Sequence, residues 1–342
     1  MTGVSLLANM CVMSAGFMII STFMCINLFH AIAALLWIAG LRRFMRPFSP
    51  LILFDLFRWA LIIPPVLILL RLFNRGSEGP HLIRAELWAR QFFLSKPLLT
   101  WLVLGLLIGT LLIFIFQELI PFIQIMGRKQ IPSHAPSARL KAALVRAKAF
   151  YREAGILSPR ISHLRTHSFP AQERLAALHG LGAPVLVVSD GLVEALDDEE
   201  LEGVLSHELA HIYLGGNMRM VWIWIARGLQ AFNPVSLVLF RELTEAREAA
   251  CDALAAKLTG KPEVLARALL KFTEDLEATS VTSDDPRTRA GIELRRRAEI
   301  HSTQTRYEAL TGELTYVRIT IWSAPLQWLT ALVLGGMLWI VA

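Results

Sequence analysis

Residues 204–216 read VLSHELAHIYLGG, in which two histidines lie four positions apart and a glutamate follows the first. On an α-helix, positions four apart lie on the same face, so both imidazoles can reach one ion. A catalytic zinc site takes three ligands from protein and leaves the fourth position open. His207 and His211 therefore supply two ligands, and Glu208 is placed to act as the general base. The third ligand has to come from elsewhere in the chain.

The sequence before this motif predicts a short strand and then a capped helix. Residues 185–188 are apolar and mostly β-branched, and a turn follows them, as is typical of a strand. Asp197, with Glu200 three positions later, forms a capping-box pattern at the start of the helix. An extended peptide can add to a sheet edge near the metal. We therefore expect four residues to bind substrate through their backbone: Val185, Leu186, Val187 and Val188.

A second helix is predicted to begin at Asn233, as its N-cap, with Pro234 as its first residue. It carries an E-x-x-x-D pattern formed by Glu248 and Asp252. Glu248 is expected to be the third zinc ligand. Asp252, one turn later, is expected to orient an imidazole through its other nitrogen. Glu245, one turn earlier, is the competing third ligand. The pattern predicts one zinc ion per chain.

Long uncharged stretches predict a membrane protein. Of the 342 residues, 54% are hydrophobic, and the mean hydropathy of +0.50 is high for a soluble domain. A helix needs about 20 apolar residues to cross a bilayer. Three long stretches lack Lys, Arg, Asp and Glu: residues 3–41, 97–117 and 319–342. A fourth, residues 51–70, contains only Asp55 and Arg58, which are three apart and can pair.

The basic residues flank the apolar stretches, although the net charge is +6. Arg42, Arg43 and Arg46 follow the first stretch, and a second basic group lies between Arg128 and Arg152. The positive-inside rule places both groups in the cytoplasm. The expected partners are therefore the lipid bilayer and a protein or peptide substrate, and no nucleic acid is expected. The three cysteines form no disulfide framework.

The resulting prediction is a mainly α-helical membrane protein. Residues 1–123 form a transmembrane helix bundle of about three spans, residues 124–318 an inserted α+β zinc-protease domain in the cytoplasm, and residues 319–342 a C-terminal transmembrane helix. The chain is then a multi-pass protein of the cell (inner) membrane. Two alternatives stay open: residues 3–41 form one span or a hairpin, and residues 220–240 contact the bilayer or form a buried core helix.

The run APVLVVSDGLVEALDDEELEGVLSHELAHIYLGGN, followed by FNP and REAACD, resembles the membrane metallopeptidases of the BlaR/MecR antirepressor type. These are gluzincins whose zinc domain lies between the third and fourth membrane spans and faces the cytoplasm. The motifs cover about residues 140–300, and SHELAH and E-x-A-C-D are the most specific. The resemblance implies Glu208 as the base. It implies these metal ligands: His207, His211 and Glu248.

Peptidases of the HtpX and CAAX-protease type share H-E-x-x-H and a later E-x-x-x-D. The separation of 37 residues between His211 and Glu248 fits the BlaR/MecR type better. The BlaR/MecR transducers carry an extracellular β-lactam-binding domain after the last span. This sequence ends at Ala342, so antibiotic sensing is not expected. HtpX-like relatives often have His-Pro after the catalytic helices, where this chain has Asp285 and Pro286.

The expected function is that of a zinc endopeptidase that cleaves proteins on the cytoplasmic side, in regulated proteolysis or signalling. One alternative is HtpX-like quality control of membrane proteins. Another is a non-catalytic signalling or scaffold protein, but a structural zinc site has no need of Glu208. Three residues are open candidates for stabilising an oxyanion: Tyr213, Arg287 and Arg289. The sequence does not determine the oligomeric state.

Overall fold

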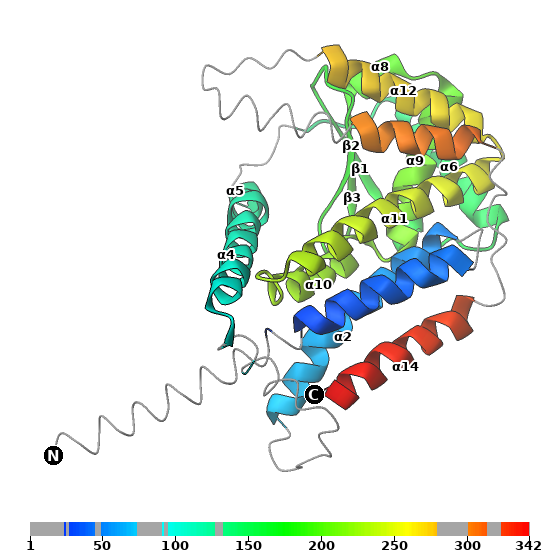
Figure 1. Ribbon diagram of the computed structural model, residues 1–342. Coiled ribbons are helices and arrows are strands. Elements are labelled where there is room, and N and C mark those ends of the chain that lie inside the picture. The colour runs from blue at the N-terminus through cyan, green and yellow to red at the C-terminus, as the bar shows by residue number, and fades with distance from the viewer. Residues whose placement is uncertain are drawn as a thin grey trace, which may run out of the picture.

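The described part of the chain is mostly helical and contains one small sheet, as Figure 1 shows. The computed structural model describes residues 24, 27–44, 49–73, 91, 95–126, 133–278, 300–312 and 323–341. The sheet and its covering helices form one layer, and the helices rich in apolar residues form a second. The predicted mainly α-helical class with a small α+β part is confirmed at this level.

The sheet has three strands in the order β1 (Arg165–Phe169), β3 (Val185–Ser189) and β2 (Ala176–His179). β3 pairs in parallel with β1 and antiparallel with β2. The outer edge of β1 is partly covered, because His134 and Ser168 exchange backbone hydrogen bonds of 2.8 and 3.1 Å. The outer edge of β2 faces the cavity described below.

This strand order corrects one expectation from the sequence. The strand predicted at residues 185–188 is present as β3, but β3 is the central strand and not an edge. Its backbone is paired on both sides and has no free edge for a substrate peptide. The residues wrongly assigned to substrate binding are Val185, Leu186, Val187 and Val188.

Five helices pack around the sheet: α6 (Ala138–Glu153), α7 (Pro159–Ser162), α8 (Asp190–Ala195), α9 (Asp198–Tyr213) and α12 (Pro262–Ala278). α9 lies at the centre of this layer and contacts α6, α7, α12 and β2. Its fully buried Leu201, Leu205 and Leu209 recur every four positions, so they form one apolar stripe in the core.

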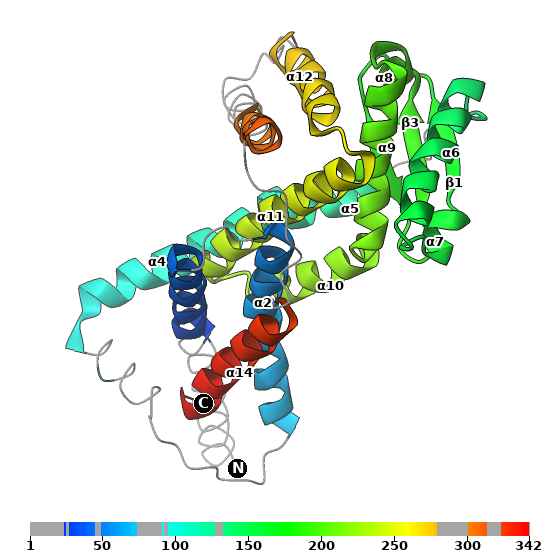
Figure 2. The same ribbon diagram turned by 90° about the vertical axis from the view of Figure 1, so that its right-hand side faces the viewer.

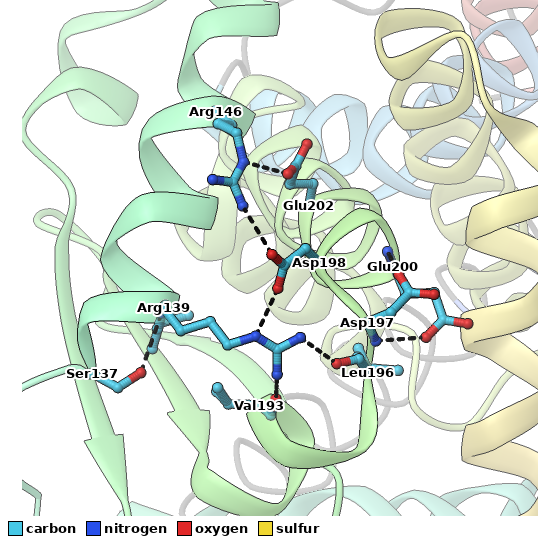
Figure 3. Close-up of polar contacts among 10 residues, drawn as sticks. Ser137, Arg139, Arg146, Val193, Leu196, Asp197, Asp198, Glu200 and Glu202 are labelled. Carbon is cyan, nitrogen blue, oxygen red and sulfur yellow. Dashed lines mark hydrogen bonds and ion pairs between the residues drawn. The ribbon is translucent and has the colours of Figure 1, made fainter.

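The start of α9 is held by polar contacts (Figure 3). The side chain of Asp197 accepts a 2.8 Å hydrogen bond from the backbone N–H of Glu200, whose carboxylate accepts one of 2.9 Å from the N–H of Asp197. The predicted capping box is therefore confirmed. Arg139 of α6 donates 2.7 Å hydrogen bonds to Asp198 and to the carbonyl of Leu196. These contacts fix where α9 begins, and thus which way its later side chains point.

The second layer contains helical residues 27–44 together with four further helices: α2 (Pro50–Phe73), α10 (Gly216–Gly228), α11 (Pro234–Thr259) and α14 (Ser323–Val341). As predicted, Asn233 caps α11, because its side chain accepts hydrogen bonds from the N–H groups of Val235 and Ser236. Figure 2 shows α11 running from the sheet layer to α2. The helix therefore belongs to both cores.

A further continuous helix consists of α4 (Pro97–Phe114), a π-helical turn η1 (Ile115–Leu119) and α5 (Ile120–Met126). Within it, residues Trp101–Ile123 have a mean hydropathy of 2.3. Among the described residues, this is the one segment both long and apolar enough to cross a membrane. The predicted bundle of several spans therefore stays a prediction.

The predicted intrahelical ion pair is confirmed on α2, where Arg58 and Asp55 approach to 2.9 Å. Residues 3–41 lie largely outside the described part of the chain, so the choice between one span and a hairpin stays open. The predicted division into residues 1–123, 124–318 and 319–342 also stays a prediction. In the structure, α11 shares its core with α2 across the first of these boundaries.

Candidate metal centre

Helix α9 places two imidazoles and one carboxylate together. Both histidine side chains are largely buried, and their rings meet edge to face with centroids 4.8 Å apart. The ligand atoms of His207, Glu208 and His211 all lie within 4.8 Å of one another. The spacing of four residues on one helix produces this cluster, as the sequence pattern predicts.

Helix α11 brings a second carboxylate to the same point. Glu248 has one oxygen 3.5 Å from Nε2 of His207 and the other 3.6 Å from Nε2 of His211. Both distances are too long for good hydrogen bonds. A tetrahedral zinc with bonds of about 2.0–2.1 Å separates its ligand atoms by about 3.4 Å. Each oxygen of Glu248 therefore lies near the ligand spacing of zinc from one imidazole nitrogen, and the ligand assignment itself stays a prediction.

Two consecutive residues of α11 hold the other nitrogens of the imidazoles. Nδ1 of His207 lies 2.8 Å from Oδ1 of Asp252, and Nδ1 of His211 lies 3.1 Å from Sγ of Cys251. Each ring thus uses Nδ1 for its neighbour and leaves Nε2 facing the shared point. The position of Asp252 agrees with its predicted role. The thiol of Cys251 was not predicted as a partner.

Arg306 is a further residue of the centre that the sequence pattern did not reveal. It belongs to the helical residues 300–311 and donates hydrogen bonds of 2.6 and 2.8 Å to the two oxygens of Asp252. It also lies 3.7 Å from an oxygen of Glu248. A buried carboxylate needs such a partner, because an unpaired buried charge is costly. Arg306 lies 54 residues after Asp252 and belongs to no local motif, so only the tertiary structure identifies it.

The electrostatics of the centre favour a cation. Burial acts to lower the pKa of His207, but the neighbouring Asp252 carboxylate outweighs it and raises that pKa to about 9. Burial lowers the pKa of His211 to about 3, and the charge of His207 acts in the same direction. Burial raises the pKa of Glu208 to about 7. Without a metal, His207 is thus the imidazole that holds a positive charge, and a metal bound at its Nε2 would displace the proton from that atom.

These side chains open into a cavity of about 580 Å³. Its polar floor contains the α9 motif and Glu248, and two apolar walls adjoin it. One wall comes from β2 and includes Ala176, Ala177 and Leu178. The other comes from α12 and includes Leu265, Leu269 and Phe272. A cavity with apolar walls and a few convergent polar groups is the usual form of a substrate site.

The competing ligand Glu245 lies outside this cavity. Its side chain is exposed and pairs with Arg241 at 3.1 Å, one turn before Glu248 on α11. The two oxygens of Glu248, in contrast, lie 3.5 and 3.6 Å from the Nε2 atoms of the two imidazoles. The geometry thus favours Glu248.

Within the described part of the chain, no residue predicted to stabilise an oxyanion lines the cavity. Tyr213 is exposed and does not line it. Arg287 and Arg289 lie outside the described residues. The cations that do line the cavity beside the ligand cluster include Arg247 and Arg306, which the sequence reasoning had not considered.

An H-E-x-x-H helix with a carboxylate from the following long helix is the arrangement of a metallopeptidase centre. Residues 169–300 match the family model described as BlaR1 peptidase M56. The matched segment includes both helices and all of the ligand candidates. The comparison thus confirms the resemblance to the BlaR/MecR type predicted from the sequence.

Curated relatives include proteins named protease HtpX homolog. The one from Thermococcus sibiricus is 30% identical over 173 residues, covering 40% of this chain and 58% of the relative. HtpX homolog 1 of Streptomyces coelicolor is 34% identical over 125 residues, covering 27% and 41%. HtpX homolog 2 of Methanosarcina mazei is 27% identical over 204 residues, covering 48% and 64%. The chain thus spans about half the length of the curated relatives it matches. No solved structure matches.

Two of the glutamates of α11, Glu245 and Glu248, allow a matched test of the third ligand. Glu248→Gln should weaken zinc binding on the order of 100-fold, because it removes an anionic oxygen from the centre. Glu245→Gln, one turn away, should leave the affinity unchanged. Competition of the purified full chain with a chromophoric zinc chelator measures both. Loss of affinity in Glu245→Gln alone would identify that residue as the ligand instead.

The thiol contact yields a separate prediction. Cys251→Ala leaves the buried Nδ1–H of His211 without an acceptor, so zinc affinity should fall by about 10-fold. Cys251→Ser keeps an acceptor and should stay near the wild type. The same chelator competition measures both variants. Equal affinities for the alanine variant and the wild type would show that the thiol does not orient the ring.

Proposed function

We propose that this chain is a membrane-embedded zinc endopeptidase that cleaves proteins on the cytoplasmic side of the cell membrane. One zinc ion would be held by His207, His211 and Glu248. The observation that supports this most directly is that the Nε2 atoms of the two histidines lie 3.5 and 3.6 Å from the two oxygens of Glu248. Two imidazoles and one carboxylate form a donor set that suits catalytic zinc.

When bound, zinc polarises the scissile carbonyl and lowers the pKa of water. Glu208 lies beside both histidines and lines the cavity, so it is placed to accept the proton of the attacking water. It then returns that proton to the amine that leaves. Asp252 and Arg306 act indirectly, since the carboxylate holds the His207 ring and the guanidinium holds the carboxylate.

The free edge of β2 is the proposed place for an extended substrate. Leu175 turns its carbonyl toward β3, where it accepts from Ser189, whereas the carbonyl of Leu178 accepts a 2.8 Å hydrogen bond from Asn217. Because strand residues alternate, Ala176 should also turn its N–H and C=O outward, over the cavity. A substrate backbone can pair with these groups close to the ligand cluster.

The membrane arrangement is part of the proposal. The candidate span at Trp101–Ile123 and the apolar stretches within residues 1–123 and 319–342 support a multi-pass protein. The basic residues that flank these stretches support a cytoplasmic position for residues 124–318. The lipid bilayer is then a partner along with the substrate. Regulated proteolysis or signalling is the role that the BlaR1 match favours.

A second candidate role is HtpX-like quality control of membrane proteins. The names of the curated relatives favour it. Both roles use the same metal centre and the same general base, so they differ in substrate and not in chemistry.

The test of catalysis compares the wild type with Glu208→Gln. In purified full-length protein reconstituted in lipid, wild type should hold one zinc and cleave a protein substrate such as casein. Glu208→Gln should keep its zinc and lose at least about 100-fold in rate, since general-base catalysis is worth about 10²–10⁴-fold. Zinc content and cleavage rate are both measured. Zinc binding without cleavage in either form would favour the non-catalytic scaffold, and absence of zinc in folded protein would overturn the metal site.

The proposed substrate edge has its own test. Ala176→Pro removes an outward N–H donor and should raise KM for an extended peptide about tenfold, the loss of roughly one hydrogen bond. Ala176→Val keeps the N–H and suits a strand, so it serves as the matched control. Zinc content should be the same in both. An unchanged KM in the proline variant would place the substrate elsewhere.

A further inference from the structure

Helix α10 presents large apolar side chains to its surroundings. Trp222, Ile225 and Leu229 are 62%, 40% and 48% exposed. Their spacing of three and four residues places them in one stripe. Val238, at the start of α11, is also exposed. Continuous apolar patches of this kind on a folded protein indicate contact with a membrane or another protein.

One charged residue of α10, Arg227, points inward beside the buried Ile223 and Ala226. Arg227 is fully buried, donates a 3.2 Å hydrogen bond to the carbonyl of Gln230 and lies 3.7 Å from a carboxylate oxygen of Glu118. Its guanidinium also lies over the ring of Phe114, 5.3 Å from the centroid. A helix in water shows the opposite pattern, with its charge outside and its apolar residues inside. This arrangement is the one expected where the surroundings are hydrocarbon.

The break between α10 and α11 satisfies its polar groups internally. Gln230 donates a 2.7 Å hydrogen bond to the carbonyl of Leu61 and accepts one of 3.0 Å from Asn27. Asn233 donates one of 2.6 Å to the side chain of Asn27. A non-helical turn is tolerated at membrane depth only when the protein supplies such partners. The turn is therefore built to exclude water.

The candidate span gives the depth of this helix. The ring of Trp224 stacks on Phe122 with centroids 4.6 Å apart, and lies 5.8 Å from Phe114. Glu118, which pairs with Arg227, lies five residues before the end of the span at Ile123. At about 1.5 Å per residue, this is about 7–8 Å below the end of the span. Interfacial helices bury their apolar face by about 5–10 Å.

We propose that α10 is an interfacial helix whose stripe of Trp222, Ile225 and Leu229 is embedded in the lipid bilayer. The occupant is lipid because α10 contacts the candidate span through Trp224 and Arg227, so the exposed stripe belongs to a helix packed on that span. The inference rests on that span lying in the bilayer and is independent of catalysis. α10 begins three residues after α9 ends, so Trp222, the stripe residue nearest in sequence, lies within roughly 25 Å of His211. Segments of substrate close to the membrane surface are thus the favoured targets.

The test measures the depth of single spin labels in the full chain in lipid nanodiscs. Labels are introduced by Trp222→Cys or Leu229→Cys in a background with Cys11→Ser, Cys25→Ser and Cys251→Ser. Oxygen partitions into the bilayer and a nickel complex stays in water, so their relative effect on the label reports depth. Leu102→Cys, exposed within the candidate span, is the lipid control, and Val145→Cys, exposed on α6, is the water control.

Labels at 222 and 229 are expected to resemble Leu102→Cys, with greater access to oxygen than to nickel. Resemblance to Val145→Cys would overturn the proposal, and so would protection from both reagents, which would indicate a protein partner. A second measurement needs no substitution. A hydrophobic carbene photolabel dissolved in vesicles should modify the wild-type segment 217–229 and leave α6 (Ala138–Glu153) unlabelled. Equal labelling of the two segments would also contradict the proposal.

Discussion

The rest of the centre depends on the contacts that the carboxylate of Asp252 makes. One of its oxygens lies 2.8 Å from Nδ1 of His207, and both oxygens accept from the guanidinium of Arg306, so the carboxylate connects α9, α11 and the helical residues 300–311. A buried anion with one partner removed costs several kcal/mol, so these three segments are held together as a unit. By occupying Nδ1, the same carboxylate leaves Nε2 of His207 facing the cavity. Cys251, its neighbour in sequence, does the same for His211 with a weaker acceptor.

Much of the site was predictable because its determinants are local. The capping box at Asp197 fixes the start of α9, and Asn233 with Pro234 fixes the start of α11, through contacts within three residues. The helical period then places His207 and His211 on one face without reference to the rest of the fold. The E-x-x-x-D pattern favoured Glu248 over Glu245 as the third ligand, and the approach of α11 to α9 agrees with that prediction.

The features that sequence did not reveal depend on tertiary arrangement. A run of β-branched residues is typical of a central strand and of an edge strand alike. The sequence alone therefore does not predict the order of β1, β3 and β2. Arg306 lies 54 residues from its partner Asp252 and belongs to no sequence motif. The apolar residues of α10 read equally well as a buried core helix. The exposure of Trp222, Ile225 and Leu229 and the inward position of Arg227 support the proposed contact with the bilayer.

Helix α11 extends over 26 residues and packs in both cores, with Leu239 and Leu243 against α2 and Ala255 in the sheet layer. From its first residue to Glu248 the axis measures about 21 Å. A tilt of about 5° about the Asn233 end therefore displaces the carboxylate by roughly 2 Å, which is one metal–ligand bond length. The first half of this rigid helix packs among the apolar helices, and Glu248 follows in the second half. Such a tilt would move Cys251 and Asp252 together with Glu248, so the contacts of α11 with both imidazoles would change at once.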